Sequence, residues 1–188
     1  YLDTQSVLKD ENNYLTCLAG PSVLGIDVSS FQGEIDWEQV RKVGVEFAII
    51  RIGGRSYGPD GEIYSDDYAQ ANYQGARAAG IQTGVYFFSQ ATTVEEAIEE
   101  AEYVLEHTKD WELEFPIVFD WEYISDTART ANVDQRTLTD CTLAFCKTVE
   151  EAGKEAKAKE FLESLMQYSV MTEEMGRYFD TPKAEYSW

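Results

Sequence analysis

Two carboxylates close an apolar segment near the middle of the chain. Asp120 and Glu122 follow the apolar residues 116–119, with Trp121 between them. In an extended segment, residues i and i+2 point to the same side, so the two carboxylates share one wall while Trp121 points elsewhere. Neighbouring carboxylates in an apolar setting do not both ionise easily, so one of them is expected to have a raised pKa. A carboxyl that keeps its proton near neutral pH can act as a general acid.

Other reactive side chains are few. The chain has one histidine, His107, and three cysteines, Cys17, Cys141 and Cys146. A single histidine excludes sites built from several histidines, and its place at the end of a helical segment favours a structural role. Cys141 and Cys146 lie five positions apart in one expected helix, which disfavours a disulfide between them, and Cys141 falls on the apolar stripe expected in the core. Carboxylates are therefore the candidates for catalysis.

The composition limits the class of protein. The 188 residues include 15 Lys and Arg against 35 Asp and Glu, a net charge of −20. The 44% hydrophobic and 13% aromatic residues suffice for a core and exclude a wholly disordered acidic chain. The acidic charge disfavours nucleic acid as a partner, and the lack of an 18-residue apolar run predicts no membrane span. Acidic pairs on helical segments, such as Glu95–Glu96 and Glu99–Glu100, are expected on solvated outer faces.

Apolar segments alternate with helical patterns along the chain. The apolar segments cover residues 23–28, 47–52, 84–88 and 116–121. Their near-continuous apolar character is typical of parallel strands covered on both faces. Helices are expected from Asp36, over residues 66–79, from Thr93, and over residues 134–152. Four successive strand–helix units predict an α/β fold whose parallel sheet closes as a barrel.

Polar residues in these strands indicate where a site would form. In a β/α barrel the reactive groups gather at the carboxyl ends of the strands. Asp27 lies late in the first strand, Arg51 late in the second, Tyr86 within the third and Asp120 at the end of the fourth. Each has a plain structural alternative: a turn cap for Asp27, an ion pair for Arg51 and simple packing for Tyr86. Their shared placement favours a site.

Four segments together resemble the glycoside hydrolase family 25 lysozymes. They are residues 25–37 (GIDVSSFQGEIDW), 47–51 (FAIIR), 76–88 (ARAAGIQTGVYFF) and 116–122 (PIVFDWE). The resemblance implies an α/β fold of the modified (β/α) TIM-like barrel type. It also implies a peptidoglycan hydrolase, an N-acetylmuramidase that cuts the β-1,4 bond between N-acetylmuramic acid and N-acetylglucosamine. No metal or organic cofactor is implied. The substrate implies a secreted, bacteriolytic enzyme, extracellular or cell-wall associated, whose partners are peptidoglycan glycan strands.

Carried over by position, the resemblance implies two catalytic residues. Glu122 would be the general acid, and Asp120 would orient the 2-acetamido group of the substrate or stabilise positive charge on the sugar ring. The candidate substrate-binding residues are Asp27, Tyr86, Arg51 and Trp121, of which Trp121 is divided evenly between sugar stacking and core packing. A substrate-assisted retaining route and a water-based inverting route both remain open.

The resemblance covers about residues 24–153. We therefore expect an N-terminal extension over residues 1–22, a catalytic β/α barrel region over residues 23–153, and a divergent or truncated segment over residues 154–188. The barrel is expected to be incomplete at its C-terminal strands, and self-association would cover the exposed strand edge. Two alternatives follow: a catalytically impaired glycan-binding barrel protein, or a chitinase-like glycosidase.

Overall fold

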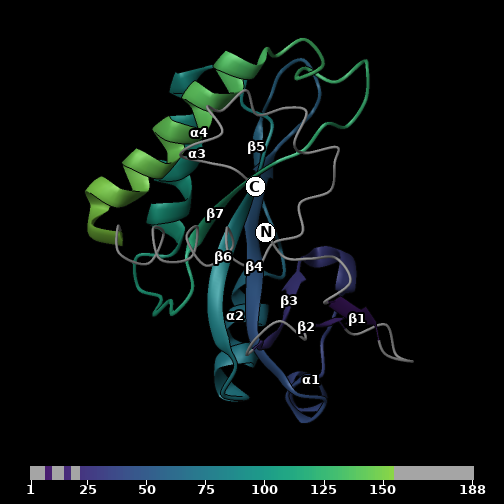
Figure 1. Cartoon of the computed structure of the whole chain (residues 1–188). Coiled ribbons are helices and arrows are strands. Elements are labelled where there is room, and N and C mark those ends of the chain that lie inside the picture. The colour runs from purple at the N-terminus through teal and green to yellow at the C-terminus, as the bar shows by residue number, and fades with distance from the viewer. Residues whose placement is uncertain (1–6, 10–14, 18–21, 155–188) are drawn as a thin grey trace.

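The computed structural model describes residues 7–9, 15–17 and 22–154, and most of them surround one parallel sheet (Figure 1). The strands are β1 (Val7–Lys9), β2 (Leu15–Cys17), β3 (Leu24–Val28), β4 (Val45–Arg55), β5 (Ile63–Ser65), β6 (Gln82–Ser89) and β7 (Ile117–Trp121). The helices are α1 (Trp37–Lys42), α2 (Ala69–Ala78), α3 (Val94–His107) and α4 (Gln135–Val149), with short helical turns η2 (Ser30–Gln32) and η3 (Glu150–Lys154). The alternating order confirms the α/β class.

The main sheet has the strand order β3–β4–β6–β7, with all four strands parallel. The short strand β5 pairs antiparallel with the end of β4. Each strand expected from the apolar segments is present. β4 extends beyond its expected end because residues 53–55 pair with β5. Within the described residues, the sheet ends at β3 and β7 and does not close into a barrel.

Helices bury one face of the sheet in two groups. α3 and α4 pack on each other beside β6 and β7 (Figure 1), over a core that includes Val85, Phe87 and Phe145. α1 and α2 contribute Trp37 and Ala76 to a second core with Ile50. Side chains alternate along a strand, so the residues between these core positions point to the opposite face. We call this opposite face the polar face, because Asp27, Arg51, Tyr86 and Asp120 lie on it.

The helix starts follow the local sequence signals. The Asp36 carboxylate accepts a hydrogen bond from the Gln39 amide at 3.0 Å, and Asp134 accepts one from the Thr137 amide at 2.8 Å. Thr93 likewise accepts from the Glu96 amide at 3.3 Å. These caps satisfy amides that the first helical turn leaves without partners, as the sequence predicted.

The acidic side of α3 differs from the expectation of a solvated face. Glu95 and Glu99 are exposed, but Glu100 is completely buried and accepts hydrogen bonds from Arg55 at 2.7 Å and from Ser89 at 2.6 Å. Glu96 pairs with Arg129 at 2.6 Å. Residues four apart share one helix face, so Glu96 and Glu100 both turn inward. The prediction was wrong for these two residues because strand and loop arginines supply buried partners.

The cysteines and the histidine lie where the sequence places them. Cys141 is buried, Cys146 is partly buried, and both are free thiols, as predicted. His107 ends α3, with its Nδ1 2.7 Å from the Tyr103 carbonyl oxygen. Within the described residues, no helix is long and apolar enough to cross a membrane.

Of the expected N-terminal extension, β1 and β2 form a small antiparallel sheet. The expected C-terminal segment lies, after Lys154, outside the described residues.

Candidate active site

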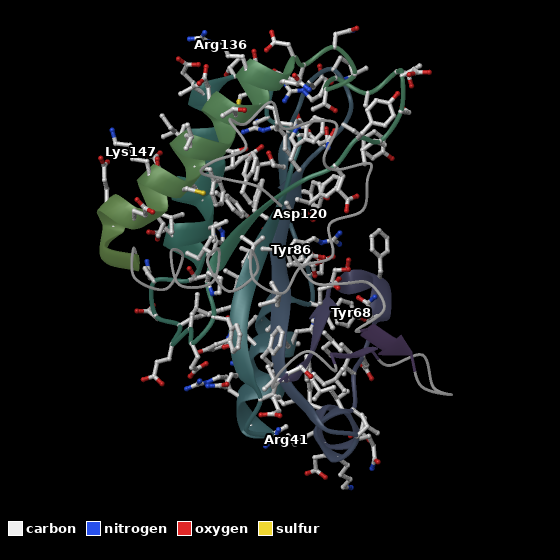
Figure 2. The ribbon with its side chains drawn as sticks, viewed as in Figure 1. Arg41, Tyr68, Tyr86, Asp120, Arg136 and Lys147 are labelled. Atoms are coloured by element: carbon white, nitrogen blue, oxygen red, sulfur yellow. The ribbon has the colours of Figure 1, made fainter. Side chains whose placement is uncertain are left out.

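Four of the expected site residues come together on the polar face. Asp27 pairs with Ile49 in the register of β3 and β4, and Arg51 lies two positions beyond Ile49, opposite Tyr86 on β6. Asp120 lies opposite Phe88, two positions beyond Tyr86. Figure 2 shows Tyr86 and Asp120 close together in the middle of the molecule. The parallel strands therefore bring two carboxylates, a guanidinium and a phenol to one face of the sheet.

A bulge in β4 sets which residues reach this wall. The register shifts between Arg51 and Gly53, so that Ile52 has no partner on β6 and packs into the core beside α3 and α4. Gly54, rather than Gly53, then lies opposite Phe88. A bulge of one residue reverses the alternation of side chains beyond it, which places Gly54 on the polar face.

Among the carboxyl groups on this face, that of Asp120 has the most strongly shifted pKa. Burial, followed by the charges of Glu122 and Asp27, raises the pKa of Asp120 to about 7, against a smaller lowering by Arg51. The sequence predicted a raised pKa for one member of the Asp120/Glu122 pair, and the structure assigns it to Asp120. A carboxyl with this pKa can hold or release a proton near neutral pH.

Tyr86 stands beside these carboxylates as a neutral phenol. Burial raises the pKa of Tyr86 to about 12; Asp27 and Asp120 add to this rise, while Arg51 and a hydrogen bond with Ser29 oppose it. The phenol therefore stays protonated at neutral pH. It lies opposite Arg51 in the sheet and can donate a hydrogen bond, but it does not act as an acid or a base.

Arg51 is held by a residue that the sequence did not single out. Its Nε donates to the Asp66 carboxylate at 2.7 Å, and its Nη2 donates to the Ser30 hydroxyl at 2.9 Å. Asp66 also accepts from the Ser30 amide at 2.9 Å, and its side chain is fully buried. The ring of Phe31 lies 4.9 Å from the guanidinium carbon. Arg51 thus joins β4 to the turn after β3, and the ion-pair alternative describes its contacts.

Tyr64 is a second residue that the sequence did not indicate. It lies on β5 opposite Gly54, and a side-chain carbon built on Gly54 would come within 2.5 Å of the Tyr64 hydroxyl oxygen. The Tyr64 phenol therefore occupies the space above Gly54, beside Phe88. Burial raises the pKa of Tyr64, and Asp66 and Asp120 add to this rise while Arg51 opposes it. β5 is only three residues long, so no alternation pattern could reveal it.

Glu122 and Trp121 differ in their placement. Glu122 is exposed, directly follows β7, and lies near enough to raise the pKa of Asp120. Trp121 is the last residue of β7 and, by alternation, points to the face opposite Asp120. The structure does not bring Trp121 to the polar face, so its contact with substrate stays a prediction. Tyr123 is 41% exposed and donates a hydrogen bond to Asp126.

The arrangement supports proton transfer between oxygen atoms. A carboxyl with a pKa of about 7, a second carboxylate nearby and a protonated phenol are the groups that polarise and protonate an ether-type oxygen. Within the described residues, no group of three or more His, Cys, Asp and Glu side chains has a geometry that would hold a metal ion.

Comparison with known proteins gives a family match. The model of the family described as glycosyl hydrolases family 25 matches residues 26–175. This range includes all the candidate residues named above and most of the chain.

Individual relatives agree with this match. Lysozyme M1 of Streptomyces globisporus is 43% identical over 68 residues, which are 36% of this chain and 21% of that protein. The autolytic lysozyme of Clostridium acetobutylicum is 34% identical over 67 residues, 36% of this chain and 19% of that protein. The structure of the modular autolysin LytC from Streptococcus pneumoniae in complex with a synthetic peptidoglycan ligand is similar with a TM-score of 0.59 and 26% identity, over 70% of this chain and 30% of that one. The matches span about a fifth of the two curated relatives.

Proposed function

The chain belongs to glycosyl hydrolases family 25, and from this premise we propose that it is a peptidoglycan hydrolase of the lysozyme type. The reaction is that of an N-acetylmuramidase, which cleaves the β-1,4 bond between N-acetylmuramic acid and N-acetylglucosamine. Two relatives that are lysozymes by name, and the structure of an autolysin with a peptidoglycan ligand, support this choice of substrate.

The observation that carries the proposal is the pair of carboxylates at the end of β7. Asp120 lies on the polar face with a pKa raised to about 7, and Glu122 lies close enough to contribute to that rise. Glycoside hydrolysis needs two carboxyl groups beside the scissile bond, one of them able to donate a proton. This strand end meets that need with residues of the matched family segment.

The roles are assigned by position in the family segments, so Glu122 is the acid although the carboxyl whose pKa is raised to about 7 is its neighbour Asp120. Glu122, exposed at the end of the strand, passes its proton to the oxygen of the leaving sugar as the glycosidic bond breaks. Asp120 faces the reacting ring and interacts with the 2-acetamido group or with the positive charge that develops on the sugar. Asp27 and Tyr86 hold the sugar from the neighbouring strands, with the Tyr86 phenol as a hydrogen-bond donor. Arg51 acts chiefly through its ion pair with Asp66.

The proposed place of action is the bacterial cell wall. The enzyme would be secreted and bacteriolytic, with peptidoglycan strands as its partner. The matched names are lysozymes and an autolysin, so neither a non-catalytic glycan-binding protein nor a chitinase-like enzyme is favoured.

The test is the release of reducing sugar ends from purified peptidoglycan by the wild-type chain and by Glu122→Gln. Loss of a general acid reduces the rate by about 10²–10⁴-fold. Glu46→Gln is the matched control, because Glu46 is an exposed glutamate at the opposite end of the sheet, near the start of β4. Equal rates for wild type and Glu122→Gln would contradict the assigned acid. Faster release from chitin oligomers than from peptidoglycan would contradict the muramidase assignment.

A further inference from the structure

Glu122 lies just beyond the end of β7, so the hydrogen-bond ladder of the sheet does not fix its position. The strand ends at Trp121, and residues 122–124 are all exposed. A group that must deliver a proton to one oxygen needs a fixed position, since displacement of about 1 Å can cost about 10²-fold in rate. Some contact outside the strand must therefore fix the backbone at Glu122.

Gln90 makes that contact. Its Nε2 donates a hydrogen bond to the Glu122 carbonyl oxygen at 2.9 Å. Within the described part of the chain, this is the one side-chain hydrogen bond that the Glu122 backbone receives. Gln90 follows β6, the neighbour of β7 in the sheet, so the contact joins adjacent strands just beyond the end of their ladder.

The Gln90 side chain is itself fixed in orientation. It is completely buried, and the same Nε2 also donates to the Ser89 carbonyl oxygen at 2.9 Å. Its Oε1 accepts from the buried Thr130 hydroxyl at 2.8 Å. An amide whose oxygen is bound to a donor cannot flip without leaving buried groups unpaired, so Nε2 is kept toward Glu122.

A charged anchor holds the loop that carries Thr130. Arg129 donates to the Gln90 carbonyl oxygen at 2.8 Å and to both carboxylate oxygens of Glu96 on α3, at 2.6 and 3.0 Å. Burial raises the pKa of Glu96, but the hydrogen bonds from Arg129 and Thr92 outweigh it and bring this pKa to about 2. The pair therefore stays charged at neutral pH, and it holds the Gln90 backbone and the loop residue next to Thr130.

We propose that Gln90 is a positioning residue that holds the Glu122 backbone, through its hydrogen bond to the Glu122 carbonyl, where the carboxyl can protonate the leaving group. This inference rests on the proposed function and on Glu122 as the acid. Gln90 is completely buried and so does not touch the substrate. It acts only through Glu122, so its loss affects the step that needs protonation.

The experiment compares two substrates that differ in their need for an acid. Hydrolysis of peptidoglycan requires protonation of a sugar oxygen, whereas a dinitrophenyl glycoside of the muramic acid disaccharide releases a stable anion without a proton. For Gln90→Met, which keeps the length of the side chain but has no donor, we expect kcat on peptidoglycan to fall by about 10–100-fold with KM nearly unchanged. On the dinitrophenyl substrate, we expect Gln90→Met and Glu122→Gln to release dinitrophenolate in the first turnover at close to the wild-type rate. The first turnover is compared because a retaining route would use Glu122 again, as the base of its second step.

The controls separate positioning from a loss of folding. Thr108→Val removes another buried hydroxyl hydrogen bond, from Thr108 to the Val104 carbonyl at the end of α3, and should leave both rates unchanged. If Gln90→Met does not fold, Thr130→Val serves in its place, because it frees the Gln90 amide to rotate and should give a smaller loss confined to peptidoglycan. An equal loss on both substrates, or no loss in an active wild-type background, would overturn the inference alone. A wild-type chain inactive on both substrates would overturn the proposed function together with this inference.

Discussion

Asp120 shows how a strand can set the chemistry of a single residue. Its carboxyl lies on the polar face, where burial and two neighbouring carboxylates oppose its ionisation and only Arg51 favours it. Arg51 is committed to Asp66 at 2.7 Å, which limits what it can do for Asp120. The raised pKa of Asp120 therefore comes first from burial and then from the two carboxylates, while its one cationic neighbour is already paired with Asp66.

This raised pKa predicts how the stability of the protein depends on pH. Unfolding returns Asp120 to an ordinary pKa near 4, while in the folded state its pKa is about 7. Below pH 4 both states hold the proton and folding carries no penalty. As the pH rises from 4 to 7, the unfolded state releases its proton first, so this contribution to stability is lost. We expect Asp120→Asn to match wild type near pH 4 and to exceed it by about 2–4 kcal/mol at pH 8.

The measurement is urea unfolding of the wild type, Asp120→Asn and Asp110→Asn at pH 4, 6 and 8. Asp110 is exposed after α3, so its replacement should give a difference from wild type that does not grow between pH 4 and 8. A difference for Asp120→Asn that stays constant with pH would contradict the assigned pKa.

Some residues of the candidate site could be predicted from the sequence, and others could not. Asp27, Arg51, Tyr86 and Asp120 could be predicted because each interrupts an apolar strand, and parallel strands bring such positions to one face. The residues that support them, Asp66, Tyr64 and Gln90, lie outside those strands. A polar residue in a loop gives no sign of its partner, since the contact depends on how distant segments meet. Asp66 in particular precedes α2 and is indistinguishable in sequence from a helix cap.

At the scale of elements, Asp66 joins three parts of the fold. Its carboxylate binds Arg51 on β4 and the Ser30 amide on η2, and its other oxygen accepts from the Tyr68 amide before α2 at 2.9 Å. We expect Asp66→Asn to lower the free energy of unfolding by about 3–5 kcal/mol, because it leaves a buried guanidinium without its counter-charge. Urea unfolding measures the loss. Asp67→Asn, at the exposed neighbouring position, should cost less than about 0.5 kcal/mol. Equal effects at the two positions would contradict a structural role for the pair.

Replacing either of the two glycines of β4 by alanine should affect β5 in a different way. A side-chain carbon on Gly53 would lie 2.3 Å from the Tyr64 backbone oxygen, whereas one on Gly54 would meet chiefly the Tyr64 phenol, which is 38% exposed and can rotate. We expect Gly53→Ala to lower stability by about 1–3 kcal/mol through strain in the β4–β5 pairing. Gly54→Ala should leave stability within about 1 kcal/mol of wild type and raise KM on peptidoglycan, because it displaces Tyr64 from the polar face.

Thermal unfolding and steady-state kinetics on the same two variants test this contrast. Tyr64→Phe is the companion variant, since it keeps the ring in place and removes only the hydroxyl. A Gly54→Ala variant with unchanged KM would show that the Tyr64 phenol takes no part in binding.

The elements themselves were largely predictable. Apolar runs and capping residues placed the four parallel strands and their helices because burial on both faces and unpaired helix amides leave direct marks in sequence. β5 and the bulge at Ile52 leave none, since both depend on the pairing of β4 with two neighbours at once. The buried ion pairs of α3 were also hidden, because a helical glutamate looks the same whether or not an arginine faces it.

At the scale of the whole molecule, a sheet that is open within the described residues accompanies a large negative charge of the chain. Within the described residues, β3 and β7 each leave one edge without a paired strand, and such edges favour pairing with another chain. The charge of −20 opposes the approach of a second copy. These two features act over different distances, since strand pairing operates at contact whereas repulsion extends over a Debye length of about 30 Å at 10 mM salt and about 8 Å at 150 mM.

Self-association, if the sheet edges drive it, should therefore increase with salt. We expect light scattering to give a mass near 21.3 kDa at 10 mM salt and a higher, concentration-dependent mass at 150 mM and above. Pairing through a hydrogen-bonded edge, unlike a complex held by charge, is not weakened by screening. A mass of 21.3 kDa at every salt and protein concentration would show that the edges of the sheet are not available to a second copy.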